Sequence, residues 1–169
     1  MSLVNGLPAH VLLVHFVVVL VPLTALALVV CAIWPKAAQR LGVVLPVLAL
    51  VTLVSVPLTT NAGEWLEGRV ADNALVRRHA ELGDGLLPWA GGLFVLAFAV
   101  WWAVGRTSAS GASDSARRPG TLVRVAATVL SLVVAAGAVV DVYRIGDSGA
   151  KAAWHDGYSK TASRGGDGG

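Results

Sequence analysis

The sequence predicts an all-α fold, an integral membrane bundle of four transmembrane helices. Hydrophobic residues make up 56% of its 169 residues and charged residues only 14%, whereas a soluble domain carries about 25% charged residues. The charges are also missing from long windows, each close to the ~20 apolar residues that a membrane span requires. We place the spans near residues 11–34, 41–62, 85–104 and 122–143.

The first span is expected to be a permanent membrane helix, because its N-terminal flank lacks the features of a signal peptide. Residues 1–10 contain no Lys or Arg, and the apolar run exceeds the ~7–15 residues of a signal-peptide core. Residues 1–156 are therefore expected to form one membrane domain, followed by a disordered tail over 157–169. The single cysteine, Cys31, excludes an internal disulfide and a cysteine-based metal cage.

Aromatic residues mark the expected ends of the spans, as they do at headgroup depth in membrane proteins. One side carries Trp34, Trp101 and Trp102, and the other carries Trp65, Trp89, Tyr143, Trp154 and Tyr158. Between the second and third spans we expect a short surface helix over Asp72–Leu82, with Asp72 as its N-cap. The Ser/Gly/Ala-rich stretch from Thr107 to Ser115 has the composition of a flexible linker.

Basic residues suggest the orientation of the chain in the membrane. The loops after the first and third spans carry Lys36, Arg40, Arg106, Arg117, Arg118 and Arg124 against the single acidic residue Asp114. The opposite side holds a similar number of basic residues, so the choice depends on their placement at the short first loop and at the start of the fourth span. We therefore expect both termini to be extracytoplasmic in the cell membrane. The net charge is only +3 and the basic residues form no stripe, which gives no support to nucleic-acid binding.

All four histidines fall on the same side of the predicted membrane. His10 and His15 open the first span, His79 precedes the third, and His155 follows the fourth. His15 lies about 6 Å into the apolar run, at 1.5 Å per residue, and an ionisable group at such a depth usually faces the bundle interior. His10 and His15 differ by about 140° around a helix, so they do not form a metal-binding pair with each other.

Charged residues on that same side could support the histidines. Glu64 follows the polar run Thr59–Asn61 at the end of the second span, and Asp141 and Arg144 are spaced to pair on one face of the fourth. Their plain interpretation is a set of interfacial charges at helix ends. Their functional interpretation is a polar pocket in which they act as outer partners of a ligand.

Four segments resemble the membrane family known as domain of unknown function 2231. These segments are Leu7–Phe16, which contains both early histidines, Ala62–Trp65, Arg78–Ala80 and Tyr143–Trp154. The resemblance implies a four-span bundle without an established activity, and some relatives look like fusions to Rieske-type iron–sulfur domains. This chain departs from the family pattern at Val11 and Val17, which replace prolines, at Glu64, which replaces an aspartate, and at Asp147, which replaces a histidine.

The leading hypothesis is a small redox-associated membrane protein with haem or a transition metal near its outer face. His15 and His79 are the expected ligands, with His10 as an alternative, and Glu64, Asp141 and Arg144 as outer partners. Imidazole suits iron, copper and zinc alike, so the metal stays open. The partners are then the lipid bilayer and other membrane or redox proteins. The competing hypothesis is a non-catalytic subunit or scaffold with structural histidines, because the sequence contains no nucleotide-binding, catalytic-triad or helical zinc motif.

Overall fold

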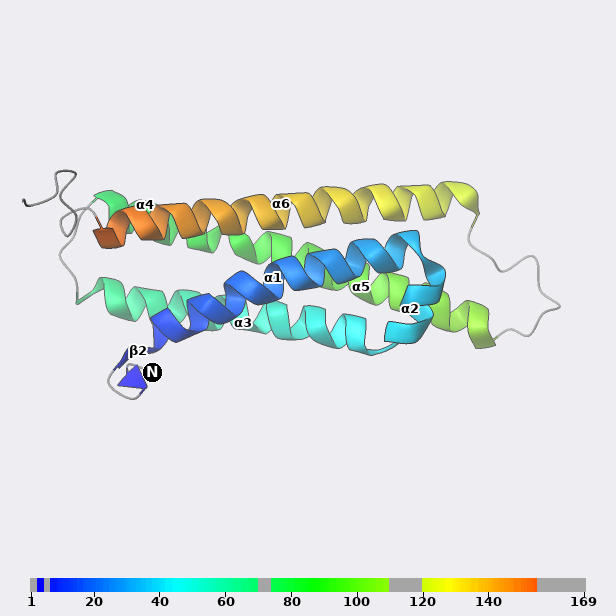
Figure 1. Ribbon diagram of the computed structural model, residues 1–169, viewed down its shortest axis with the longest axis horizontal. Coiled ribbons are helices and arrows are strands. Elements are labelled where there is room, and N and C mark those ends of the chain that lie inside the picture. The colour runs from blue at the N-terminus through cyan, green and yellow to red at the C-terminus, as the bar shows by residue number, and fades with distance from the viewer. Residues whose placement is uncertain (1–2, 5–6, 70–73, 110–119, 155–169) are drawn as a thin grey trace, which may run out of the picture.

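A computed structural model of the chain describes residues 3–4, 7–69, 74–109 and 120–154 (Figure 1). Its main elements are four long helices: α1 (Ala9–Ile33), α3 (Val44–Glu67), α5 (Leu86–Ala109) and α6 (Thr121–Trp154). All four belong to segments long and apolar enough to cross a membrane. The predicted all-α membrane bundle is therefore confirmed.

The helices differ from the predicted spans mainly at their ends. A small antiparallel pair of strands, β1 (Leu3–Val4) and β2 (Leu7–Pro8), precedes α1. The helix α6 continues to Trp154, beyond the predicted end of the fourth span at 143. The helix α5 reaches Ala109, inside the segment expected to be a linker. The predicted tail over 157–169 lies outside the described residues.

The long helices pack in a closed order, with α1 against α3, α3 against α5, α5 against α6, and α6 back against α1 (Figure 1). Small side chains line the contacts between them. Ala25, Ala49, Ala90, Ala97 and Ala138 are all buried. Since apolar side chains gain nothing by leaving lipid, close backbone approach over small residues is how membrane helices associate.

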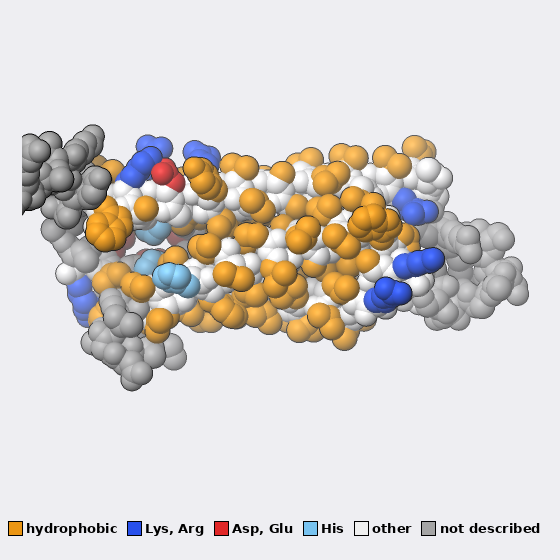
Figure 2. Space-filling view, in the orientation of Figure 1, with side chains coloured by type: hydrophobic (Ala, Val, Ile, Leu, Met, Phe, Trp, Pro, Cys, Tyr) orange, Lys and Arg blue, Asp and Glu red, His pale blue; other side chains and the backbone are white. Residues whose placement is uncertain are grey.

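The outer surface of the bundle is largely apolar, as Figure 2 shows along its whole length. Side chains such as Val19, Leu26 and Val95, each more than 60% exposed, point outward from the middle of their helices. A soluble protein rarely exposes so much contiguous apolar surface. This surface is therefore the face that contacts lipid.

Most hydroxyl groups inside the bundle are paired, in keeping with the cost of a bare polar group in an apolar interior. Among the described residues, Ser131 Oγ is buried without a hydrogen-bond partner. Thr24 on α1 and Thr52 on α3 share a buried hydrogen bond of 2.7 Å between their Oγ1 atoms. Thr52 also donates to the carbonyl of Leu48 at 2.9 Å. Cys31 is buried as a free thiol, as expected of a small apolar residue.

Two short helices lie at opposite ends of the bundle. The helix α4 (Ala74–Asp84) packs against α6 and leads into α5 through Gly85. It matches the surface helix expected between the second and third spans, although Asp72, the expected N-cap, lies outside the described residues. The helix α2 (Pro35–Leu41) follows α1 and was not predicted, although Pro35 at its first position is a typical helix-start signal.

Candidate histidine site

The described histidines gather at one end of the bundle, where α1 begins and α6 ends (Figure 2). His10 lies in the first turn of α1, His15 lies one and a half turns further along, and His79 lies on α4. His155 lies outside the described residues. The prediction that the histidines share one side of the membrane therefore holds for His10, His15 and His79.

His10 links α1 to α3. Its Nδ1 lies 3.0 Å from the carbonyl oxygen of Thr59. A carbonyl oxygen can only accept a hydrogen bond, so Nδ1 carries the proton and donates it. The ring also lies against Gly63, where an added Cβ would be 3.1 Å from His10 Cε1 and Nδ1.

His79 links α4 to α6 in the same manner. Its Nδ1 lies 3.1 Å from the carbonyl oxygen of Ile145 and 3.0 Å from Ser148 Oγ. The Ser148 hydroxyl donates its own proton to Ile145 O at 2.8 Å, so it offers a lone pair to His79. The proton between the two side chains therefore belongs to Nδ1. The ring lies against Gly149, where a Cβ would be 2.9 Å from His79 Cε1.

Both contacts use one backbone arrangement. Each histidine donates to the carbonyl of residue i on a neighbouring helix and packs on a glycine at i+4, the pairs being Thr59 with Gly63 and Ile145 with Gly149. In an α-helix the carbonyl of residue i points toward residue i+4. A side chain at i+4 would block a ring that approaches this carbonyl, so glycine opens the way to it.

The two histidines also contact each other. Their ring centroids are 6.1 Å apart and their planes are inclined by 84°, an edge-to-face arrangement. Because both Nδ1 atoms donate to fixed acceptors, each neutral ring keeps the lone pair on Nε2. Metal-binding histidines have this tautomer, with the other ring nitrogen donating to a carbonyl or carboxylate that orients the ring. The hydrogen bonds therefore fix the orientation of both rings and leave Nε2 of each ring outside these bonds.

The expectation that His15 turns into the bundle is wrong. Its side chain is exposed, and its Nδ1 lies 2.6 Å from the carbonyl oxygen of Val11 on its own helix. The reason is the angular offset of about 140° between residues five apart on a helix. Since His10 faces α3, His15 on the same straight helix turns outward.

None of the expected outer partners forms a hydrogen bond with His10 or His79 in the described part of the chain. Glu64 and Arg144 are both exposed, and neither forms a side-chain hydrogen bond or ion pair within the described residues. Asp141 and Arg144 do not form the ion pair that their spacing suggested. Asp141 Oδ2 is buried without a hydrogen-bond partner within the part of the chain that the structure describes. Ser148 and the backbone carbonyls of Thr59 and Ile145 hold the rings instead.

Asp147, one of the positions at which this chain departs from the expected family pattern, is not part of the His10–His79 pair. Asp147 is exposed and forms an ion pair with Lys151, with Oδ2 and Nζ 2.6 Å apart. It thus extends away from the neighbouring Ser148, which is buried beside His79.

Sequence reasoning missed Ser148, Gly63 and Gly149 as parts of the site. One sequence signal could have indicated the two glycines: Gly63 and Gly149 each lie in one of the four segments that carry the family resemblance. His10, Gly63, His79 and Gly149 come one from each of these segments, and the structure brings them together. Within the described residues no three His, Cys, Asp or Glu side chains form a cluster suited to a metal ion.

Comparison with known proteins identifies a family for this chain. The family model described as "Predicted membrane protein (DUF2231)" matches residues 6–162, which is nearly the whole chain and includes all four segments. No curated protein and no solved structure gives a significant match. The chain therefore belongs to the DUF2231 family of predicted membrane proteins.

Proposed function

We propose that this protein is a small redox-associated membrane protein that holds a transition-metal ion between His10 and His79. The observation that carries the proposal is the shared tautomer of the two rings. Each Nδ1 donates to a carbonyl on a neighbouring helix, which leaves two Nε2 lone pairs on rings 6.1 Å apart. Imidazole nitrogen suits copper, zinc, iron and nickel. His15 is not included, because its side chain turns away from the pair.

The surroundings of the pair favour a bare ion over haem. Two axial histidines would suit haem iron as well, but haem also needs a slot lined by apolar side chains. The groups that hold these rings include two glycines, a serine hydroxyl and two backbone carbonyls, which are small or polar. An ion needs only the two Nε2 atoms as ligands, with its remaining positions taken by water or by a partner's ligand.

A second candidate function has its own support. The same hydrogen bonds tie α1 to α3 and α4 to α6, so His10 and His79 could serve only to hold the helices in place. The protein would then be a non-catalytic scaffold or subunit. The scaffold role requires only the Nδ1–H donors, whereas metal binding also requires Nε2. This difference separates the two candidate functions.

Replacing each histidine with asparagine tests the proposal, because the Asn amide can donate from nearly the position of Nδ1 but offers nothing in place of Nε2. The full-length protein in detergent is incubated with Cu, Zn or Fe, passed through a desalting column, and assayed for metal and for a visible spectrum. We expect the wild type to retain one ion per chain, and His10→Asn and His79→Asn to retain almost none. His15→Asn is the matched control on the same helix and should retain the ion.

The outcomes separate the candidates. Under the scaffold function the wild type retains no metal, and His10→Asn keeps more stability than His10→Ala, which loses about 1 kcal/mol with its hydrogen bond. A Soret band in the wild type that disappears in His79→Asn would identify haem in place of the ion. Equal metal retention in wild type and both asparagine variants would rule out the pair as ligands.

The membrane orientation belongs to the same proposal. We place the histidine end at the extracytoplasmic face of the cell membrane and the end with Lys36, Arg40 and Arg124 at the cytoplasmic face, following the positive-inside rule. The metal site would then be accessible to redox partners outside the cytoplasm. The short α4 covers part of this end, against α6.

A further inference from the structure

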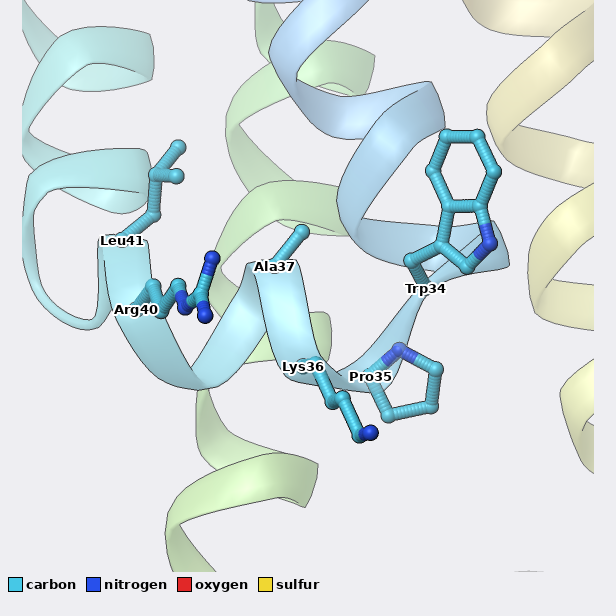
Figure 3. A pocket seen from close by; sticks show the side chains of 6 residues that line it. All are labelled: Trp34, Pro35, Lys36, Ala37, Arg40 and Leu41. Carbon is cyan, nitrogen blue, oxygen red and sulfur yellow. The ribbon is translucent and has the colours of Figure 1, made fainter.

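The end of the bundle opposite the histidines carries an open hollow on the surface of α2 (Figure 3). Its volume is about 710 Å³, and it is lined by Trp34, Pro35, Lys36, Ala37, Arg40 and Leu41. This hollow lies directly after α1 ends at Ile33 and before α3 begins at Val44. The place is therefore the boundary between the apolar bundle and the water on that side.

The fold presents the two cations of α2 on one outward face. Ala38 is only 3% exposed and packs into the core, while Lys36 and Arg40, one turn apart, are both exposed. Gly42, with φ of +51°, ends the helix in a conformation that side-chain-bearing residues rarely adopt. This turn allows α2 to lie across the end of the bundle with its basic face outward.

The charge at this end has no acidic counterpart within the described residues. The described acidic side chains lie in the last turn of α3, on α4, and in the C-terminal half of α6, all toward the histidine end. Arg124 adds a further cation at the start of α6, in a second hollow that also includes Ile33 and Val125. Among the described residues, an anion would therefore find several cations and no repelling carboxylate.

Aromatic side chains fix the depth of these cations. Trp34 is 62% exposed beside Lys36, and Trp102 lies under the guanidinium of Arg106, which is 4.6 Å from its ring centroid. Indole rings at helix ends settle at the level of lipid headgroups. Lys36 and Arg40 are thus placed at the depth of lipid phosphates.

We propose that the hollow on α2 binds the headgroup of an anionic phospholipid, with Lys36 and Arg40 on its phosphate. The apolar lining from Trp34 and Leu41 takes the first part of an acyl chain, which can continue past Ile33 and Val125 along the outer surface of α1 and α6. The cations thus complement the charge of the lipid phosphate, and the apolar side chains complement the acyl chain. The site is independent of the histidine pair at the other end.

Binding of matched lipids to the full-length protein tests this proposal. Detergent-purified protein is titrated with phosphatidylglycerol or phosphatidylcholine of the same acyl chains, and bound lipid is counted by native mass spectrometry. We expect the wild type to prefer phosphatidylglycerol by about tenfold or more, because each basic residue near a membrane surface attracts anionic lipid. Lys36→Gln with Arg40→Gln should remove the preference, and Lys36→Arg with Arg40→Lys should keep it.

The matched control carries the same change of charge at the other end of the molecule. Arg78→Gln with Lys151→Gln also removes one Arg and one Lys, both exposed, and should leave the preference intact. Equal binding of the two lipids by the wild type would overturn the proposal, as would equal losses in the two Gln pairs. Displacement of phosphatidylglycerol by millimolar inorganic phosphate would show a site for free phosphate and would also overturn it. Circular dichroism confirms that each variant keeps its helices.

Discussion

The imidazole rings of His10 and His79 meet edge to face, with their centroids 6.1 Å apart. His10 belongs to α1 and is bonded to α3, while His79 belongs to α4 and is bonded to α6. The contact between the two rings therefore connects the α1–α3 pair, which His10 links, with the α4–α6 pair, which His79 links. Any change that moves either ring off its carbonyl changes the distance between the two Nε2 atoms as well.

Gly149→Ala should displace the His79 ring. The added Cβ would lie 2.9 Å from His79 Cε1 and 3.2 Å from its Nδ1, so the ring must leave the Ile145 carbonyl. We expect a loss of about 1–3 kcal/mol in stability from overpacking and the broken hydrogen bond, together with loss of any bound metal. Unfolding in SDS, monitored by circular dichroism, measures the stability.

Gly146→Ala is the control for this prediction, on the same helix and three residues earlier. A Cβ at Gly146 meets nothing within 4 Å. Alanine should therefore be neutral or stabilise the helix by roughly 0.5–1 kcal/mol. Equal destabilisation by the two alanines would show that the His79 ring does not depend on the space at Gly149.

The four-helix bundle could be predicted from the sequence because its signal is local. A charge-free apolar run marks a span wherever its neighbours pack, and the runs lie within α1, α3, α5 and α6. The helix α2 was missed, because a short basic segment between two spans was interpreted only as a loop. Pro35 was the one residue that marked its start.

The site could be predicted only in part, because its contacts join residues far apart in the chain. The sequence placed the histidines on one side, but the choice of His15 over His10 rested on depth in the apolar run. The structure starts α1 at Ala9, so His10 already belongs to the helix and occupies the inward direction. Nothing local in the sequence shows that Gly63 and Gly149 each clear a carbonyl for a ring from another helix.

Gly137→Ala should clash with Trp89, and removing the indole should relieve the clash. The added Cβ would overlap the indole ring of Trp89, which requires the ring or the α5–α6 spacing to shift. We expect the single variant to lose about 1–3 kcal/mol in stability. In a double-mutant cycle with Trp89→Leu, the loss caused by Gly137→Ala should shrink markedly. Additive effects of the two substitutions would contradict the contact.

The Thr24–Thr52 hydrogen bond should contribute modestly to stability. Thr52 Oγ1 keeps its bond to the Leu48 carbonyl when Thr24 is replaced with valine, so no buried donor is left bare. We expect a coupling energy of about 0.6 kcal/mol, the average for polar pairs between membrane helices. A cycle of Thr24→Val, Thr52→Val and the double variant, unfolded in SDS, measures it. A coupling near zero would mean that each hydroxyl is equally well satisfied by its own backbone.

The orientation of the bundle predicts the side of each loop. A reporter fused at Ser110, the residue after the end of α5 at Ala109, should read cytoplasmic, and one fused after Gly169 should read extracytoplasmic. The reason is that Lys36, Arg40 and Arg124 lie together at one end with no described acidic side chain, and basic residues are retained on the cytoplasmic side. The cytoplasmic leaflet is also the one with a negative surface potential from anionic lipids, so the α2 hollow would face its ligand. The opposite result in the two fusions would mean that the bundle has the reverse orientation. The histidine pair would then lie on the cytoplasmic side and the α2 hollow in the outer leaflet.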